Sequence, residues 1–506
     1  MPRPPDSRTV AARSRRTSDP ALPAGWLNGE VAVIGLARSG RAVATLLART
    51  GADVYASDSG DSGALHGTAV ALRREGVDVA LGGHDLARIA RASLVVTSPG
   101  VPPDAPPLAR AIGNGVEVVS EVEIALRLMP DLRYVAVTGT NGKTTTTALV
   151  ATLFSALGHR ATAAGNIGTP LAELALEPVA PDWVALEISS FQLHDTPSIA
   201  PCVGVLTNLS ANHLDRYASV DEYFGDKALL FRNATAASQW VTNADDPAVE
   251  ALAAGAAGLH CRFSTRGDAD ACYDRGRGLL EVFGEPLLAR ADLALMGDHN
   301  VANALAASLA VMLASEAHRT PAALGTIARA LRAFHALEHR IEIVGEQEGV
   351  LWINDSKSTN VASTAVALRG MTRPTVLLLG GKHKGEPYTT LAGELRRTCT
   401  LVIAYGEAAP LIEQDLRGVI PVQRLGSSFQ TVVDAARAAA RPGQAVLLSP
   451  ACSSYDMFDN YEQRGREFKR LALEGARGST AASRENTTRG AEPDGGPHAA
   501  HVARER

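Results

Sequence analysis

The chain has 506 residues, of which 46% are hydrophobic and 5% aromatic, and its formal net charge at pH 7 is −5. This length suffices for roughly three domains. The acidic balance excludes a general electrostatic surface for nucleic acid, and no apolar run is long enough to cross a bilayer. We expect a protein of the cytoplasm that binds no nucleic acid and is not inserted in a membrane.

The five cysteines are scattered without a CxxC motif, which favours a reducing compartment over a disulfide framework or a zinc site. We interpret them as small core residues. Residues 1–24 lack the apolar core of a secretory signal, and residues 477–506 are too polar to offset the entropy of ordering. Both segments are predicted to be disordered tails, with an organelle transit peptide as the alternative for the first.

Residues 30–40 predict a strand, a glycine turn and a helix start, and the following strand ends at Asp58, in a Rossmann-like arrangement. Ala37 stands where the second glycine of G-x-G-x-x-G allows close approach to a pyrophosphate, so NAD is disfavoured. The turn alone leaves open a different nucleotide or mere packing. The strand 94–97 runs into the turn 98–100, at an edge where open α/β sheets bind ligands.

A strand at 133–138 leads into Gly139-Thr140-Asn141-Gly142-Lys143-Thr144, where an apolar-periodic helix begins. Glycines let backbone N–H groups converge on an anion, and the helix N-terminus and Lys143 add positive charge. A hydroxyl at Thr144 can bind Mg²⁺. Only two residues separate the glycines, against four in a Walker loop. The pattern predicts a phosphate-binding loop, and the alternative is an ordinary strand-turn-helix corner with a surface lysine.

Three further residues of chemical interest follow this loop. Glu187 lies in the apolar middle of a predicted strand over 183–193, where a carboxylate is costly unless it pairs with an arginine or binds a metal. His213 follows a predicted strand in polar surroundings. Lys227 falls in a short helical segment and, taken by itself, is best interpreted as a solvated surface charge.

Asn300 and Asn303 lie one turn apart at the start of an Ala- and Leu-rich helix, where such a pair can cap the helix or read the edge of a base. A last α/β domain is predicted from about Leu337. It opens with a strand hairpin, and polar loops follow its strands at 354–360 and 449–456.

Six segments together resemble the Mur ligases over about residues 26–474. They are Gly139–Thr145, Gly165–Gly168, Glu187–Leu193, Asn212–Arg216, Trp352–Lys357 and Ser449–Ser454. Within the family, Ser-Ser-Phe-Gln-Leu and Asn-Asp-Ser-Lys are similar to the members that add D-glutamate. The resemblance implies an α/β fold of three domains: a Rossmann-like UDP-binding domain at 25–121, a central P-loop-type ATPase domain at 122–336, and a Rossmann-like amino-acid-binding domain at 337–476.

The activity that the resemblance implies is ATP-dependent ligation of D-glutamate to UDP-N-acetylmuramoyl-L-alanine through an acyl phosphate. This reaction belongs to peptidoglycan precursor synthesis, and thus to cell shape and division. It implies ATP as co-substrate and two Mg²⁺ sites, and we expect a monomer. By the same resemblance Lys143, Glu187, His213 and Lys227 are catalytic. Thr144 and Glu187 hold one Mg²⁺, and His213 and Lys227 hold the other, with Lys227 converted by CO₂ to a carbamate.

The resemblance also implies three groups of binding residues. For ATP these are Gly139, Thr140, Asn141, Gly142, Lys143, Thr144, Thr145, Asn300, Asn303, Arg340, Asp355 and Lys357. For the UDP substrate they are Arg38, Ser39, Asp58, Ser59, Ser98, Gly100, Asn166 and His213. For D-glutamate they are Thr359, Lys384, Ser454, Tyr455 and Tyr461.

Competing functions remain at this point. A folylpolyglutamate synthase would lack the leading nucleotide domain, and another Mur ligase would differ in the amino acid it adds. A nucleotide-sugar-binding protein that has lost the chemistry would not need Lys143, Glu187, His213 and Lys227 together. A dehydrogenase is disfavoured by Ala37 and by the phosphate-binding loop.

Overall fold

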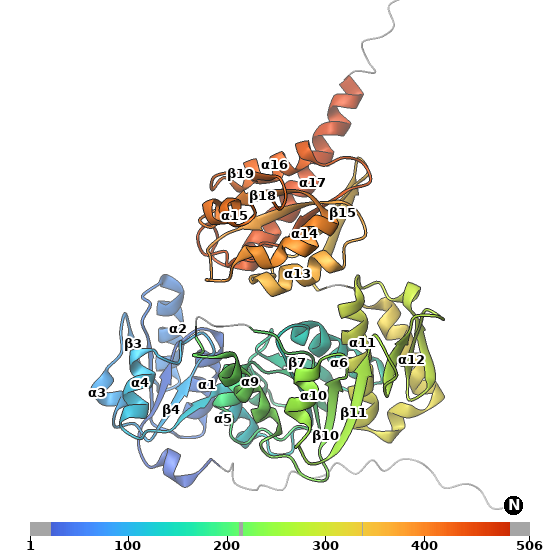
Figure 1. Ribbon diagram of the computed structural model, residues 1–506. Coiled ribbons are helices and arrows are strands. Elements are labelled where there is room, and N and C mark those ends of the chain that lie inside the picture. The colour runs from blue at the N-terminus through green and yellow to red at the C-terminus, as the bar shows by residue number, and fades with distance from the viewer. Residues whose placement is uncertain (1–21, 212–215, 336, 486–506) are drawn as a thin grey trace, which may run out of the picture. The chain divides into compact units, whose positions relative to one another are not determined.

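A computed structural model describes residues 22–211, 216–335 and 337–485, and over these ranges the chain is an α/β protein with three sheets (Figure 1). It divides into two compact units. The first ends at Phe334 and holds two sheets, and the second begins at His335 and holds the third, with Leu295–Gly297 joining it. Among the helices of the described ranges, none has the length and apolar character needed to span a membrane.

The N-terminal sheet has five parallel strands in the order β3-β2-β1-β4-β5. Its central strands β1 and β4 are buried along their length and apolar except for Thr97, as expected where helices cover both faces. Because the strands are parallel, the turns after β1, β2 and β4 meet at one edge. The elements are β1 Val31–Ile34, α1 Arg38–Arg49, β2 Val54–Asp58, α2 Gly63–Arg74, β3 Asp78–Leu81, α3 Leu86–Ile89, β4 Leu94–Thr97, α4 Pro106–Gly113 and β5 Val118–Ser120.

The central sheet has nine strands in the order β14-β13-β12-β11-β10-β9-β6-β8-β7, and β12, β13 and β14 form its antiparallel end. Strand β6, which leads to the phosphate-binding loop, lies between β8 and β9. The elements are α5 Glu121–Leu128, β6 Tyr134–Thr138, α6 Lys143–Ala156, β7 Ala161–Gly165, α7 Leu171–Ala175, β8 Trp183–Glu187, α8 Ser190–His194, β9 Val203–Leu206, α9 Val220–Ala228, β10 Gln239–Asn243, α10 Pro247–Ala253, β11 Leu259–Ser264, β12 Ala271–Asp274, β13 Leu279–Val282, β14 Glu285–Ala289, α11 Asp298–Ala314 and α12 Pro321–Ala333.

The predicted strand over 183–193 is wrong beyond Glu187. Strand β8 ends there, and α8 begins at Ser190. The cause is a capping box, because the Ser189 hydroxyl accepts from the Gln192 N–H while the Gln192 side chain accepts from the Ser189 N–H. Glu187 therefore stands at the carboxyl end of its strand instead of in the middle.

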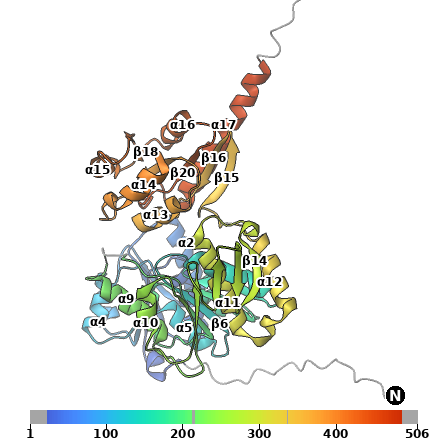
Figure 2. The ribbon, with the colours of Figure 1, turned by 45° about the vertical axis from the view of Figure 1, so that its right-hand side comes forward.

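The sheet of the second unit has the order β15-β16-β20-β17-β18-β19, and the predicted hairpin of β15 and β16 is confirmed. Figure 2 shows α17 alongside β15 and β16. The elements are β15 Glu342–Gln347, β16 Val350–Asn354, α13 Val361–Arg369, β17 Thr375–Gly380, α14 Ala392–Thr398, β18 Cys399–Tyr405, α15 Ala409–Asp415, β19 Val422–Arg424, α16 Phe429–Ala439, β20 Ala445–Leu448 and α17 Tyr461–Glu485. All five cysteines are free thiols. Cys261 and Cys452 are buried as predicted, but the interpretation as core residues is wrong for the other three, which are half-buried: Cys202, Cys272 and Cys399.

Helices α6 and α11 pack against each other (Figure 1). A contact between two histidines joins the segments that follow their C-terminal ends. Nε2 of His159 lies 2.9 Å from Nε2 of His318, and Nδ1 of His318 donates to the Val311 carbonyl at 2.7 Å. Since Nδ1 of a neutral His318 carries the hydrogen, its Nε2 accepts from His159. One hydrogen atom, carried by Nε2 of His159, thus lies between the two imidazole rings.

This histidine pair predicts an acid-sensitive first unit. Burial, together with the nearby His159 and Arg133, lowers the pKa of His318. The unfolded chain takes up a proton near pH 6.5, whereas the folded chain resists it, so stability is present above about pH 6.5 and falls as the pH drops further. His318→Asn, which cannot titrate, should give a flatter dependence of the unfolding temperature on pH between 8 and 5.5. The exposed His66→Asn serves as the control, and a wild-type slope in His318→Asn would contradict the assignment.

Candidate active site

The phosphate-binding loop joins β6 to α6 through Gly139 and Gly142, which have φ values of 140° and 82°. Only glycine takes such angles without strain. Gly142 is the N-cap of α6 and supplies no side-chain acceptor, so the first N–H groups of the helix are oriented for an external anion. Lys143 folds over the loop and donates to the Gly139 carbonyl at 3.0 Å and the Thr140 carbonyl at 2.8 Å. Thr144 and Thr145 are buried in the first turn.

The end of the neighbouring strand β9 fixes the shape of this loop. Asn208 accepts from the Asn141 N–H through Oδ1 at 2.9 Å and from the Thr140 N–H through its carbonyl at 2.8 Å. The Thr207 hydroxyl donates to the Asn141 carbonyl at 2.6 Å. Sequence reasoning did not assign Thr207 and Asn208 a role, although polar residues directly after a buried strand were a usable signal.

Asn300 and Asn303 are both buried, and they connect α11 to the loop helix. Asn303 Oδ1 accepts from the Thr146 hydroxyl at 3.2 Å, and its Nδ2 donates to Asn300 Oδ1 at 3.1 Å. A Cβ added at Gly142 would overlap Asn303 Oδ1. The pair thus packs directly against the phosphate-binding loop, and adenine binding by these residues stays a prediction.

Lys227 is buried in α9 with 1% of its surface exposed, so its interpretation as a solvated surface charge is wrong. Its ammonium donates to the Gly139 carbonyl at 2.9 Å, the same oxygen that Lys143 contacts. Burial and then the charge of Lys143 hold the pKa of Lys227 well below its usual range, although Asp226 and Glu187 act in the opposite direction. The neutral amine is therefore favoured here far more than at the surface.

Asp226, which directly precedes Lys227, is engaged elsewhere. It accepts from the Tyr217 hydroxyl at 2.8 Å and pairs with Nδ1 of His194 at 2.8 Å. Its carboxylate raises the pKa of His194. Asp226 anchors α9 to α8 and leaves Lys227 turned toward the loop.

Glu187 lies at the carboxyl end of β8 with 2% of its surface exposed. Its Oε1 accepts from Nδ2 of Asn166 at 3.0 Å, and its Oε2 has no hydrogen-bond partner among the described residues. No arginine pairs with it in the described part of the chain, contrary to the structural alternative. A buried carboxylate oxygen without a donor fits a bound Mg²⁺, which prefers oxygen ligands.

His213 lies outside the described residues. Within the described ranges, no group of three or more His, Cys, Asp and Glu side chains gathers as a metal centre. The observation that supports a cation site is thus the buried Glu187 oxygen that has no hydrogen-bond partner among the described residues.

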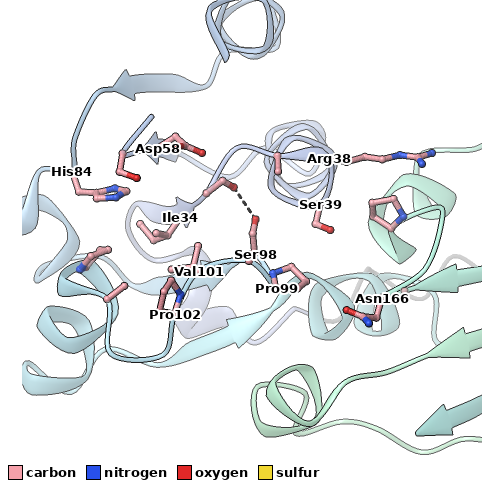
Figure 3. Close-up of a pocket in the computed structure, with 18 of the residues that line it drawn as sticks. Ile34, Arg38, Ser39, Asp58, His84, Ser98, Pro99, Val101, Pro102 and Asn166 are labelled. Carbon is pink, nitrogen blue, oxygen red and sulfur yellow. Dashed lines mark hydrogen bonds between the residues drawn. The ribbon is translucent and has the colours of Figure 1, made fainter. Parts of the chain in front are cut away.

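A pocket of about 710 Å³ lies between the N-terminal sheet and the 165–170 loop of the central domain (Figure 3). Every described residue predicted for the UDP substrate lines it: Arg38, Ser39, Asp58, Ser59, Ser98, Gly100 and Asn166. The sequence alone did not indicate His84 or Pro102, which also line it, because no motif marks either residue.

Hydrogen bonds within the N-terminal domain shape this pocket. The Asp58 carboxylate accepts from the N–H of Leu36 at 2.7 Å and of Gly60 at 2.8 Å, so it braces the glycine turn. The Ser98 hydroxyl donates to the Gly35 carbonyl at 2.7 Å. Ala37 has φ −64°, an angle open to any residue, so this turn does not need a glycine there.

Two residues join the pocket to the central domain. Arg38 donates to the Gly168 carbonyl at 2.6 Å and pairs with Glu173. Asn166 contacts Glu187 through its side chain, and its N–H donates to the Glu187 carbonyl at 2.9 Å. One end of the pocket therefore reaches the carboxylate next to the phosphate-binding loop.

In the second unit, Asp355 is buried at the end of β16 and accepts from the hydroxyls of Ser358 and Ser449 at 2.5 and 2.8 Å. Burial raises its pKa to about 6. The Lys357 ammonium lies 5.4 Å from the centre of the Tyr461 ring. These contacts bring the predicted loops after β16 and β20 together.

Arg464 is a fully buried residue that sequence reasoning missed. Its guanidinium donates to the carbonyls of Ser356 at 2.8 Å and Cys452 at 3.2 Å. It therefore links the loop after β16 to the loop after β20 from a buried position. Of the residues predicted for D-glutamate, Ser454 is buried, Thr359 and Tyr461 are half-buried, and Lys384 and Tyr455 are exposed.

Three segments of the chain match domains of known proteins. The descriptions "Mur ligase MurD-like, N-terminal domain", "Mur ligase middle domain" and "Mur ligase, glutamate ligase domain" match residues 29–120, 137–311 and 339–452. The chain belongs to the Mur ligase family. A UDP-N-acetylmuramoylalanine--D-glutamate ligase of Geotalea uraniireducens is 41% identical to this Mur ligase over 448 residues, 88% of this chain and 97% of that protein. One from Salinibacter ruber is 39% identical over 87% of this chain and 96% of its own.

Solved structures share the fold of this Mur ligase. The UDP-N-acetylmuramate-alanine ligase of Thermotoga maritima matches with a TM-score of 0.56 at 19% identity, over 88% of this chain and all of that one. A pseudomurein peptide ligase type C of Methanothermus fervidus matches with a TM-score of 0.52 at 20% identity, over 84% and 97%. The predicted three-domain α/β fold is confirmed, and the exact domain limits stay predictions.

Gly142→Ala tests whether the loop contact with Asn303 matters for nucleotide binding. Gly158→Ala is the matched control, because Gly158 has a similar φ of 89° but nothing within 4 Å of an added Cβ. Each substitution should destabilise the fold by roughly 1–2 kcal/mol through left-handed strain. Only Gly142→Ala should also weaken ATP binding, measured by calorimetry. Equal ATP affinity in the two variants would contradict the role of the contact.

Proposed function

We propose that this Mur ligase joins D-glutamate to UDP-N-acetylmuramoyl-L-alanine at the expense of ATP, in the synthesis of peptidoglycan precursors. The observation that carries the proposal is the match to relatives of this activity over 96–97% of their length. The geometry agrees with it. Asn166 lines the pocket predicted for the nucleotide sugar, and its side chain contacts Glu187, whose strand neighbours the one that leads into the glycine loop.

The proposed reaction has two steps. The carboxylate of the sugar peptide attacks the γ-phosphorus and ADP leaves, and the neutral amine of D-glutamate then attacks the acyl carbon and phosphate leaves. The first step brings anions together, so the site needs cations and oriented N–H groups more than a base. Lys143, the α6 N-terminus and the glycine loop supply them.

We propose Thr144 and Glu187 for one Mg²⁺, and His213 with a carbamate on Lys227 for a second. When bound, Mg²⁺ neutralises phosphate oxygens and orients them. The carbamate proposal is supported by the burial and lowered pKa of Lys227, because CO₂ combines with the neutral amine. It would place a hard anionic oxygen beside Lys143 where the amine now stands.

Further assignments are proposed from the family resemblance. They are Asn300 and Asn303 for adenine, Arg340, Asp355 and Lys357 for the nucleotide, and Thr359, Lys384, Ser454, Tyr455 and Tyr461 for D-glutamate. A cytoplasmic location and a monomeric state are likewise proposals. Size-exclusion chromatography with light scattering tests the monomeric state.

Phosphate release from ATP tests the function directly. With UDP-N-acetylmuramoyl-L-alanine present, a panel of amino acids should give turnover with D-glutamate and none with L-glutamate, L-alanine, L-lysine or meso-diaminopimelate. Turnover with another of these acceptors alone would place the chain elsewhere in the family.

Lys227→Ala should lose nearly all activity if the carbamate is formed, while the folded state remains. Short carboxylic acids such as acetate should restore part of the rate by placing an anionic oxygen in the vacated space. Lys227→Arg should stay inactive, because a guanidinium remains protonated and takes up no CO₂. Wild-type turnover by either variant at saturating Mg²⁺ would refute the carbamate.

Lys384→Ala should raise the KM for D-glutamate about ten- to a hundredfold and leave the KM for ATP within a few-fold. A hydrogen bond to a charged group typically contributes roughly 1.5–3 kcal/mol. The exposed Lys382→Ala, two residues away, is the control for loss of surface charge. Equal increases in both KM values would place Lys384 in the nucleotide site or in the fold.

A further inference from the structure

His84 lines the nucleotide-sugar pocket and has no role in the assignments above. It follows β3, and its Nδ1 lies 2.9 Å from the Ser57 hydroxyl. Backbone hydrogen bonds hold its loop against the end of β2, because Gly83 donates to the Asp58 carbonyl at 3.1 Å and Asp85 donates to the Tyr55 hydroxyl at 3.0 Å. The imidazole is therefore placed by a rigid frame, with Nδ1 engaged by protein.

The pocket has two chemically different ends. Asn166 lies at one end, in contact with the carboxylate beside the phosphate-binding loop, so the reacting end of the substrate belongs there. Figure 3 shows Asp58 and His84 together on the opposite side from Asn166. A nucleotide sugar carries its base at the end remote from the reacting peptide. The base must then lie near Asp58 and His84.

The charges of the residues near Asp58 and His84 favour an uncharged ring at this end of the pocket. Among the described residues that line the pocket, Arg38 is the one permanent cation, and it contacts Gly168 and Glu173. Burial lowers the pKa of His84, although the charge of Asp58 opposes this, so the ring is neutral at neutral pH. A neutral imidazole offers one hydrogen-bonding nitrogen beyond Ser57, which fits the edge of a base better than a diphosphate.

We propose that His84 reads the nucleobase of the substrate by a hydrogen bond between its Nε2 and the edge of the uracil ring. The inference rests on the proposed function. It assigns His84 as a residue that determines specificity for uracil, with Ser57 fixing the orientation of its ring.

Two isosteric substitutions separate base contact from a merely structural role. The amide nitrogen of glutamine reaches the position of Nε2, and that of asparagine reaches the position of Nδ1. His84→Gln should keep the KM for UDP-N-acetylmuramoyl-L-alanine within about twofold. His84→Asn should raise it about three- to tenfold, the range expected for one neutral hydrogen bond, with kcat and the KM for ATP unchanged.

The preference for one base over another would not change if His84 had only a structural role. Calorimetric titration with UDP and CDP should show a preference for UDP in the wild type and in His84→Gln, and a ratio closer to one in His84→Asn. Thermal unfolding of each variant checks that the fold is retained.

Three results overturn the inference. Equal KM and UDP preference in His84→Asn and the wild type would show that the ring only holds Ser57, and so would greater damage in His84→Gln than in His84→Asn. If the wild type binds UDP but adds no D-glutamate, the proposed reaction fails while the contact with the base can still hold. If the wild type binds neither UDP nor CDP, both proposals fall.

Discussion

Lys143 and Lys227 direct two ammonium groups at one carbonyl oxygen, that of Gly139. Two like charges this close in a buried setting repel each other and cost desolvation, so the arrangement is favourable only if anions arrive or one amine is neutral. Neighbouring residues hold the two lysines in this arrangement. Thr207 and Asn208 hold the loop from one side, and Tyr217 and His194 keep Asp226 from folding onto Lys227. Triphosphate binding and amine modification would each relieve the repulsion.

Asn166 connects Glu187 to the pocket proposed for the nucleotide sugar. Its backbone and side chain both contact Glu187, and Gly165 is required beside it because an added Cβ would overlap the Glu187 carbonyl. Two hydrogen bonds and this close approach therefore join the pocket wall to the proposed metal ligand.

The sequence was sufficient for features set by local chemistry. The glycines at the phosphate-binding loop and the hairpin of β15 and β16 follow from short-range patterns, whereas the pocket residues of the N-terminal domain came from the family resemblance. It failed where two local signals competed, as in 183–193, where the capping box at Ser189 ended an otherwise apolar strand. It also failed where tertiary packing decides. The burial of Lys227 and Arg464 depends on elements distant in the sequence, and no pattern in the neighbouring residues predicts it.

Arg38 crosses from the glycine turn of the N-terminal domain to the Gly168 carbonyl of the central domain, and the 165–170 loop forms one wall of the pocket. The site proposed for the nucleotide sugar is thus not a module of the first domain. A fragment cut after β5 would keep Asp58, Ser98 and His84 but would leave the cavity open along one side. Exchange of the first domain between relatives, in evolution or in the laboratory, would have to carry this loop with it to preserve the site.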